Sequence, residues 1–169
     1  MNRIAAFEKV SRERFLTDWT DTFGTTKEAA EQVYQTLRLP KRATVGSAGY
    51  DFFSPQAIAL KPGESVKIPT GIRARMREDY VLMLFPRSGL GFKFRLQLNN
   101  TVGIIDSDYY NSDNEGHIFL KLTNDSREGR TVEIPEGTGF AQGIFLPFGI
   151  TEEDDVTGIR NGGFGSTTR

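Results

Sequence analysis

Hydrophobic residues in the first 37 positions recur at roughly helical spacing and are separated by charged residues. The apolar positions of a first predicted helix are Ile4, Phe7, Phe15, Trp19 and Phe23. A second stripe, at i, i+3, i+4 and i+7, consists of Ala30, Val33, Tyr34 and Leu37. Thr25 and Glu28 form a capping box before this stripe, and Leu39-Pro40 ends it. The pattern predicts a helical extension over residues 1–40, whose stripe either docks on the rest of the chain or contacts a partner.

After Pro40 the pattern changes to short apolar or alternating runs divided by Gly, Pro, Asn and Asp, such as "YVLMLFP", "FRLQL" and "HIFLKL". In "HIFLKL" alternate residues should face opposite ways, as in a half-buried strand. We expect the core side to hold Ile118, Leu120 and Leu122, and the exposed side to hold His117, Phe119 and Lys121. Many short strands with turn residues between them predict an all-β sandwich, jelly roll or barrel over residues 41–150.

The last predicted segment, residues 151–169, begins with the acidic run "TEEDD" and ends in "RNGGFGSTTR". We expect the acidic run to be a solvated hinge in preference to a metal site. The glycine-rich part has little side chain to bury, so it should be a flexible arm. It nevertheless carries hydroxyls, backbone N–H groups and Arg160, which are the components of a phosphate clamp.

Composition narrows the classes of protein. The 21 basic and 22 acidic residues nearly cancel, so no broad basic field indicates nucleic acid. The chain has no cysteine, which excludes disulfides, thiol catalysis and thiolate metal sites. No apolar run approaches the ~18 residues of a membrane span, and the first residues are too charged for a secretory signal. We therefore expect a cytoplasmic protein that binds neither nucleic acid nor membrane.

The chemistry available to catalysis is also limited. The single histidine, His117, has no hydroxyl nucleophile beside it in sequence, which disfavours a Ser-His-Asp triad. One histidine and no cysteine make a zinc site unfavourable as well. Carboxylates and hard cations remain, so Mg²⁺ is the expected cofactor.

Five polar, glycine-marked stretches interrupt the predicted strands: "GSAGYDFFS" (46–54), "PRSGLG" (86–91), "NNTVGIIDSDYY" (99–110), "GFAQGIF" (139–145) and the terminal "RNGGFGSTTR" (160–169). Asp51 stands just inside a strand in the first, and the second follows an almost wholly apolar strand. The third reads as a hairpin, and Gln142 lies inside a strand in the fourth. Each stretch alone is explained by an ordinary turn or loop. Their order and content together are more specific.

The five stretches resemble the ordered motifs of the trimeric dUTP diphosphatase (dUTPase) family. "AGYD", "PRSGLG", "VGIIDSDY", "AQ" and "GGFGST" stand in that family's order, and the third and fifth are the most specific. The resemblance implies a distorted jelly-roll β fold and a homotrimer with active sites at subunit interfaces. It also implies Mg²⁺-dependent hydrolysis of dUTP to dUMP and pyrophosphate, which limits uracil incorporation into DNA and supplies dUMP for thymidylate synthesis.

Taken residue by residue, the resemblance gives Asp106 the task of holding and deprotonating the attacking water, and gives Asp51 a water-mediated contact with Mg²⁺. Tyr109 would pack under the deoxyribose and leave no room for a ribose 2′-OH. Phe164 would lie over the uracil while Arg160 and its neighbours close on the γ-phosphate. The implied substrate-binding positions are Arg87, Ser88, Gly89, Asn100, Gly103, Ile104, Ile105, Tyr109, Phe119, Gln142, Arg160, Phe164, Gly165, Ser166 and Thr167.

The chain also departs from the family pattern. "YNSDNE" (110–115) intervenes where the third motif usually runs directly into a basic residue and Gly, and Gly139-Phe140 replace a usual Arg before the fourth. Lys121 occupies the place of the catalytic Glu of the related dCTP deaminases, which argues against deamination. Two further hypotheses are a nucleotide-sensing protein that signals through the N-terminal helices and a structural β-trimer without a ligand.

Overall fold

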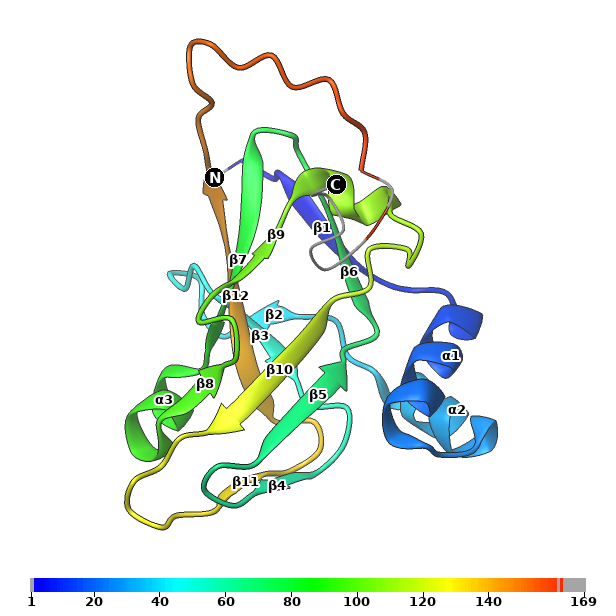
Figure 1. The fold of residues 1–169 in the computed structure, drawn as a ribbon, viewed down its shortest axis with the longest axis vertical. Helices are drawn as coiled ribbons and strands as arrows, with labels where there is room; N and C mark the ends of the chain where they lie inside the picture. Colours follow the sequence, from blue (N-terminus) through cyan, green and yellow to red (C-terminus); the bar gives the residue numbers. More distant parts are fainter. Residues whose placement is uncertain (1, 161, 163–169) are drawn as a thin grey trace.

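The computed structural model describes residues 2–160 and residue 162. This part of the chain is mainly β with helices near the N-terminus, as the sequence predicts (Figure 1). The strands are β1 (Ala5–Lys9), β2 (Lys41–Arg42), β3 (Tyr50–Phe53), β4 (Ile58–Leu60), β5 (Ser65–Pro69), β6 (Ile72–Met76), β7 (Tyr80–Pro86), β8 (Leu96–Leu98), β9 (Gly103–Ile105), β10 (Phe119–Asn124), β11 (Val132–Ile134) and β12 (Gly139–Pro147). The helices are α1 (Arg12–Phe23), α2 (Lys27–Thr36), α3 (Ser88–Phe94) and the 3₁₀ helix η1 (Ser107–Asn111).

Antiparallel pairing joins these strands into sheets. The largest has the order β2-β3-β12-β7-β9, and a second has the order β5-β10-β8. Shorter pairs join β1 to β6 and β11 to β4. At the centre of the large sheet, β12 and β7 pair from Ala141 opposite Pro86 to Pro147 opposite Tyr80. The crossing order of the strands agrees with the expected distorted jelly roll.

The main core lies between these sheets and follows the period-two pattern of the strands. On β7, Leu82 and Leu84 are buried, and on β10, Leu120 and Leu122 are buried. Lys121, between the last two, is exposed. Alternate burial is what a strand with one face on a core requires, so the prediction for this part of "HIFLKL" is confirmed.

The first residues do not continue the N-terminal helix, and that part of the prediction is wrong. Residues 5–9 form β1, which pairs with β6 from Ala5 opposite Met76 to Lys9 opposite Ile72. Phe7 packs against the rings of Tyr50, Phe52 and Phe145, with centroid separations of 5.3, 5.6 and 5.4 Å. The edge of β6 and the aromatic cluster are both distant in sequence, and pairing and packing with them outweigh the local helical spacing of residues 5–9.

The two helices that follow are formed and capped locally. Ser11 caps α1 by accepting a hydrogen bond from the Arg14 N–H, and Gly24 ends it in the left-handed conformation (φ 63°). Thr26 caps α2 by accepting from the Ala29 N–H, so the predicted cap at Thr25 is wrong by one residue. Adjacent threonines have the same capping chemistry, and only the path of the chain selects between them.

The helices form a second buried cluster beside the β body (Figure 1). Its buried members are Val10, Phe15, Leu16, Trp19, Ala30 and Leu37. Val33 and Tyr34 pack against it, so the whole predicted stripe of α2 docks inside the protein. Gly71 (φ 72°), between β5 and β6, leaves no space for a side chain beneath Leu37 and Phe15. None of the helices in the described residues is both long and apolar enough to cross a membrane.

Candidate active site

Three of the five motifs meet where β3, β12 and β7 lie side by side. Asp51 on β3 pairs with Gln142 on β12, and Arg87 follows the last residue of β7. The Arg87 Nη2 lies 3.4 Å from the Asp51 Oδ2, and the Gln142 Nε2 donates to the Pro86 carbonyl at 3.3 Å. We call Asp51, Arg87 and Gln142 the arginine half-site. The predicted positions of Asp51 and Gln142 inside strands are confirmed.

Gly139 makes room for this arrangement. Arg87 Nη1 donates to the Gly139 carbonyl at 3.5 Å, and a Cβ at Gly139 would lie 2.9 Å from the same nitrogen. Phe140 is fully buried in the main core. The two residues that replace the family's usual arginine therefore serve packing and the placement of Arg87.

The "PRSGLG" stretch does not form a loop. Ser88 and Gly89 begin α3, for which Arg87 is the N-cap, and the Arg87 carbonyl accepts from the Leu90 and Gly91 N–H groups at 3.0 Å. This helix has no buried residue. Its first backbone N–H groups and the Arg87 guanidinium therefore stand at the same end of β7.

The third motif is held against β7 by close packing. A Cβ at Gly103 would lie 3.0 Å from the Leu84 Cβ, which explains a glycine at this position. Ile105 is buried and Ile104 is 52 % exposed. Asn100 lies in the preceding turn, where its carbonyl accepts from the Val102 N–H at 2.7 Å. The predicted hairpin is wrong, because β8 pairs with β10 whereas β9 pairs with β7.

Asp106 is the N-cap residue of η1, and its carboxylate faces Arg160. Arg160 Nη2 lies 2.5 Å from Asp106 Oδ2, and Arg160 Nε lies 2.8 Å from Asp108 Oδ1. Residues 148–160 arch from the end of β12 to reach this point (Figure 1). The arginine of the last motif thus contacts the carboxylate that the resemblance makes catalytic. Phe164, Gly165, Ser166 and Thr167 lie outside the described residues, and the flexibility expected of residues 151–169 stays a prediction.

Tyr109 lies in η1, three residues after Asp106, and is buried. Its hydroxyl donates to the His117 carbonyl at 2.7 Å and accepts from the Asn114 side-chain amide at 2.8 Å. Burial raises the pKa of the Tyr109 phenol, so the hydroxyl stays a donor at neutral pH. Phe119 begins β10, with its ring centroid 4.6 Å from that of His117. We call Asp106 and Tyr109 the aspartate half-site.

His117 is fully buried, and its predicted place on an exposed strand face is wrong. Its Nε2 accepts from the Gly71 N–H at 2.8 Å, and its Nδ1 lies 2.6 Å from Asp18 Oδ2 on α1. Burial lowers the pKa of His117, against the opposing effect of Asp18. A proton on Nε2 would also face the Gly71 N–H, so the neutral Nδ1–H form fits both contacts. Sequence reasoning missed Asp18, because its partner is 99 residues away.

The two half-sites lie far apart on one chain. Ile105 stands opposite Leu82, which is five residues before Arg87, the residue that follows β7. At about 3.3 Å per strand residue, Ile105 and Arg87 are roughly 17 Å apart. In Figure 1, α3 lies at the lower left, whereas the helical turn that follows β9 lies in the upper part of the molecule.

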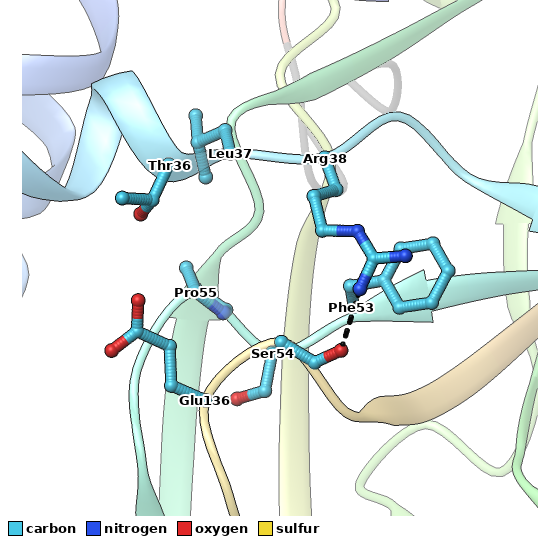
Figure 2. A pocket seen from close by; sticks show the side chains of 8 residues that line it. Thr36, Leu37, Arg38, Phe53, Ser54, Pro55 and Glu136 are labelled. Atoms are coloured by element: carbon cyan, nitrogen blue, oxygen red, sulfur yellow. Dashed lines mark hydrogen bonds between the residues drawn. The ribbon is translucent and has the colours of Figure 1, made fainter.

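A small pocket lies elsewhere and contains none of the predicted site residues. Figure 2 shows Arg38 over the Phe53 ring, where the guanidinium is 3.9 Å from the ring centroid and also donates to the Gly137 carbonyl at 3.0 Å. The lining residues are Thr36, Leu37, Arg38, Phe53, Ser54, Pro55, Glu136 and Gly137. Arg38 closes this pocket by joining the end of α2 to the β body.

Within residues 2–160 and 162, no three His, Cys, Asp or Glu side chains come together as a metal cage. Residues 151–155, the "TEEDD" run, are exposed, and their expected role as a solvated hinge stays a prediction. A Mg²⁺ ion needs no such cage when it is held mainly by phosphates and water. The single carboxylate of Asp51, beside Arg87, is the kind of donor set that fits a hydrated ion carried by a phosphate chain.

Comparison with known proteins identifies the family. The dUTPase family model matches residues 35–168. The deoxyuridine 5′-triphosphate nucleotidohydrolases of Lactococcus lactis and Shigella sonnei are 43% and 37% identical over 134 and 139 residues, which is 78% of this chain and 88% and 87% of theirs. The crystal structure of the dUTPase from Streptococcus mutans matches with a TM-score of 0.62 and 37% identity, over 87% of this chain and 98% of that one. The chain belongs to the dUTPase family.

Proposed function

We propose that this protein hydrolyses dUTP to dUMP and pyrophosphate. The observation that carries the proposal is the aspartate half-site, in which a partly exposed Asp106 carboxylate stands one helical turn from a buried Tyr109. A carboxylate of this kind can hold and deprotonate a water molecule, while a fixed aromatic ring beside it can receive a sugar. The names of the bacterial relatives support dUTP as the substrate.

The remaining residues divide by the part of the nucleotide that they would bind. The turn at Asn100 and the backbone of residues 103–105 would read the uracil edge, with Phe119 beside them, because buried donors and acceptors reject a mismatched base. Arg87, Ser88, Gly89 and Gln142 would bind phosphate oxygens through a guanidinium, a hydroxyl, backbone N–H groups and an amide. Arg160, Phe164, Gly165, Ser166 and Thr167 would cover the base and the γ-phosphate.

Arg160 would act in two states. In the structure its guanidinium neutralises Asp106 and Asp108. A triphosphate offers the same guanidinium more negative charge, so substrate would draw Arg160 onto the γ-phosphate and leave Asp106 free to take a proton from water. Substrate binding and activation of the base would then occur together.

The proposed active enzyme is a homotrimer, as the family resemblance implies. A hydrogen bond reaches only about 3 Å. In one site Asp106 would hold the water that attacks a phosphate and Arg87 would bind phosphate oxygens, but on one chain these residues stand at different ends of β7. The arginine half-site of a second chain can complete the aspartate half-site of the first. An outward apolar strip across β9, β7 and β12, formed by Ile104, Met83 and Ile144 in register, supports contact with another copy.

Mg²⁺ is the proposed cofactor, and Asp51 would hold it through water. The ion would neutralise phosphate charge and orient the triphosphate for attack. Asp51 would contribute further by keeping the Arg87 guanidinium in place, 3.4 Å from its carboxylate. The product dUMP would serve thymidylate synthesis in the cytoplasm, and removal of dUTP would limit uracil in DNA.

Replacement of Asp106 by Asn tests the proposal. Asn keeps the shape but cannot accept a proton, so we expect turnover of dUTP to fall about 10³-fold while the nucleotide still binds. Steady-state release of pyrophosphate gives the rate, and calorimetric titration gives the affinity. Asp21→Asn, an exposed position on α1, is the matched control and should keep the parent rate. A turnover of Asp106→Asn within tenfold of the parent would remove Asp106 from this role.

A further inference from the structure

The N-terminal β1–α1 segment lies against the six residues inserted after the third motif. The Ser11 N–H and hydroxyl both donate to the Glu115 carboxylate at 2.7 Å. Tyr110 donates its hydroxyl to Glu8 on β1 at 2.7 Å. Two segments that have no counterpart in the minimal family pattern therefore hold each other, and residues 1–34 also lie outside the match to the family model.

The charges at this contact agree with the geometry. The hydrogen bond from Tyr110 is the main cause that lowers the pKa of Glu8. Burial acts to raise the pKa of Glu115, but the hydrogen bonds from Ser11 and the charges of Arg73 and Arg14 together outweigh it, and the net shift is downward. Arg14 Nη2 also donates to the Asp113 carbonyl at 3.3 Å. Ionised carboxylates with several charge-assisted hydrogen bonds make a fixed contact.

A second, buried connection runs from α1 to the aspartate half-site. Asp18 accepts from His117 Nδ1–H at 2.6 Å, and the imidazole is anchored on its other side by the Gly71 N–H. The backbone carbonyl of the same histidine accepts from the Tyr109 hydroxyl at 2.7 Å. Two hydrogen bonds, through His117, thus connect Asp18 to Tyr109, whose ring would lie under the sugar.

The loop between the two connections has little freedom to adjust. Gly116 has φ 70°, and a Cβ there would lie 2.7 Å from the Tyr110 Cα and 2.8 Å from the Tyr109 carbonyl oxygen. Backbone this close transmits a displacement of His117 directly to η1. A shift of about 1 Å in a positioning group is enough to change catalysis strongly.

We propose that the β1–α1 extension is a positioning element of the nucleotide site, in which Asp18 acts through His117 to fix Tyr109 and so sets the discrimination between deoxyribose and ribose. The inference rests on the proposed function for its substrate. Asp18 and His117 touch no substrate and are positioning residues. The six-residue insertion lengthens the third motif, and the β1–α1 extension of the same chain would hold that motif in its orientation.

Asp18→Ala is the direct test. It removes the acceptor for His117 Nδ1–H, and we expect the ratio of kcat/KM for dUTP to that for UTP to fall about tenfold, the size of one lost buried hydrogen bond. Asp18→Asn retains an acceptor and should stay within about threefold of the parent. Asp21→Ala, on the exposed side of the same helix, should leave the ratio unchanged. Trp19, the single tryptophan, reports by fluorescence whether α1 remains docked.

An unchanged ratio in Asp18→Ala with α1 docked would overturn the proposal, as would an equal fall in Asp18→Ala and Asp21→Ala. If Asp18→Ala does not fold, the ¹⁵N spectrum of the single histidine in the parent decides. A neutral Nδ1–H imidazole supports the proposal, and an Nε2–H or charged ring contradicts it. If the parent hydrolyses no dUTP, the proposed function is contradicted but the positioning role of Asp18 is not. The ratio of dUMP to UMP affinity in the same variants then tests the positioning role, with the same outcomes.

Discussion

Because the two half-sites are separated on one chain, two inactive variants, one altered in each half-site, should restore activity when they are mixed. Arg87→Ala removes the guanidinium beside Asp51, and Asp106→Asn removes the proposed base, which follows Ile105 at the other end of β7. Each variant alone should be nearly inactive. If one active site takes Asp106 from one subunit and Arg87 from another, mixed trimers contain sites in which both residues are intact. Random mixing in equal amounts makes about a quarter of the sites intact, because each contributing subunit has an even chance of being the right one.

The assay is pyrophosphate release after the two variants are unfolded and refolded together. Native mass spectrometry of the refolded mixture shows mixed trimers directly, because the Arg87→Ala and Asp106→Asn subunits differ in mass. Wild type refolded with the double variant is a second test, since a shared site lowers its activity from about half to about a quarter, whereas a site within one chain keeps it at about half. Recovery of about a quarter of wild-type activity from the two single variants is the expected result. If mixed trimers form and the single variants stay inactive, both residues belong to one chain's site and the shared-site reasoning is refuted.

Two further predictions concern stability. Gly143→Ala should lower the free energy of unfolding by about 1–3 kcal/mol in urea titrations, because a Cβ there would lie 2.8 Å from Leu82 Cδ1 and 3.1 Å from both Leu84 and Phe52. Gly46→Ala is the control, because the space around Gly46 is open. Equal losses of stability in the two variants would contradict the packing argument for Gly143. The free energy of unfolding should also fall as the pH drops below about 6.5, since burial lowers the pKa of His117 and the unfolded chain then binds more protons than the folded one. His117→Gln should flatten this dependence between about pH 7.5 and 5.5, and an unchanged slope would show that His117 does not cause it.

Much of the β body could be predicted from the sequence because its pattern is local. Alternation placed Leu120 and Leu122 in the core, and the flanking turn residues placed Asp51 just inside one strand and Gln142 inside another. The stripe of α2 was also predictable, since a helix with one apolar face has to bury it. These features depend on neighbours within a few residues.

The errors share a physical cause, which is a partner distant in the sequence. Residues 5–9 form a strand because β6 offers an edge more than 60 residues away. His117 is buried because α1, with Asp18, covers it. The predicted hairpin fails because β8 and β9 pair with strands of different sheets. In the proposed homotrimer the relation of Asp106 to Arg87 would involve more than one chain, so no local pattern would contain it.

The most direct measurement is steady-state release of pyrophosphate from dUTP, dCTP, dTTP and UTP at equal concentrations in the presence of Mg²⁺. A site that reads the uracil edge and leaves no room for a 2′-OH predicts a kcat/KM for dUTP at least about 10²-fold above the other three. Comparable rates with dCTP or UTP would contradict the base and sugar assignments, and saturable dUTP binding without pyrophosphate release would contradict the hydrolase itself.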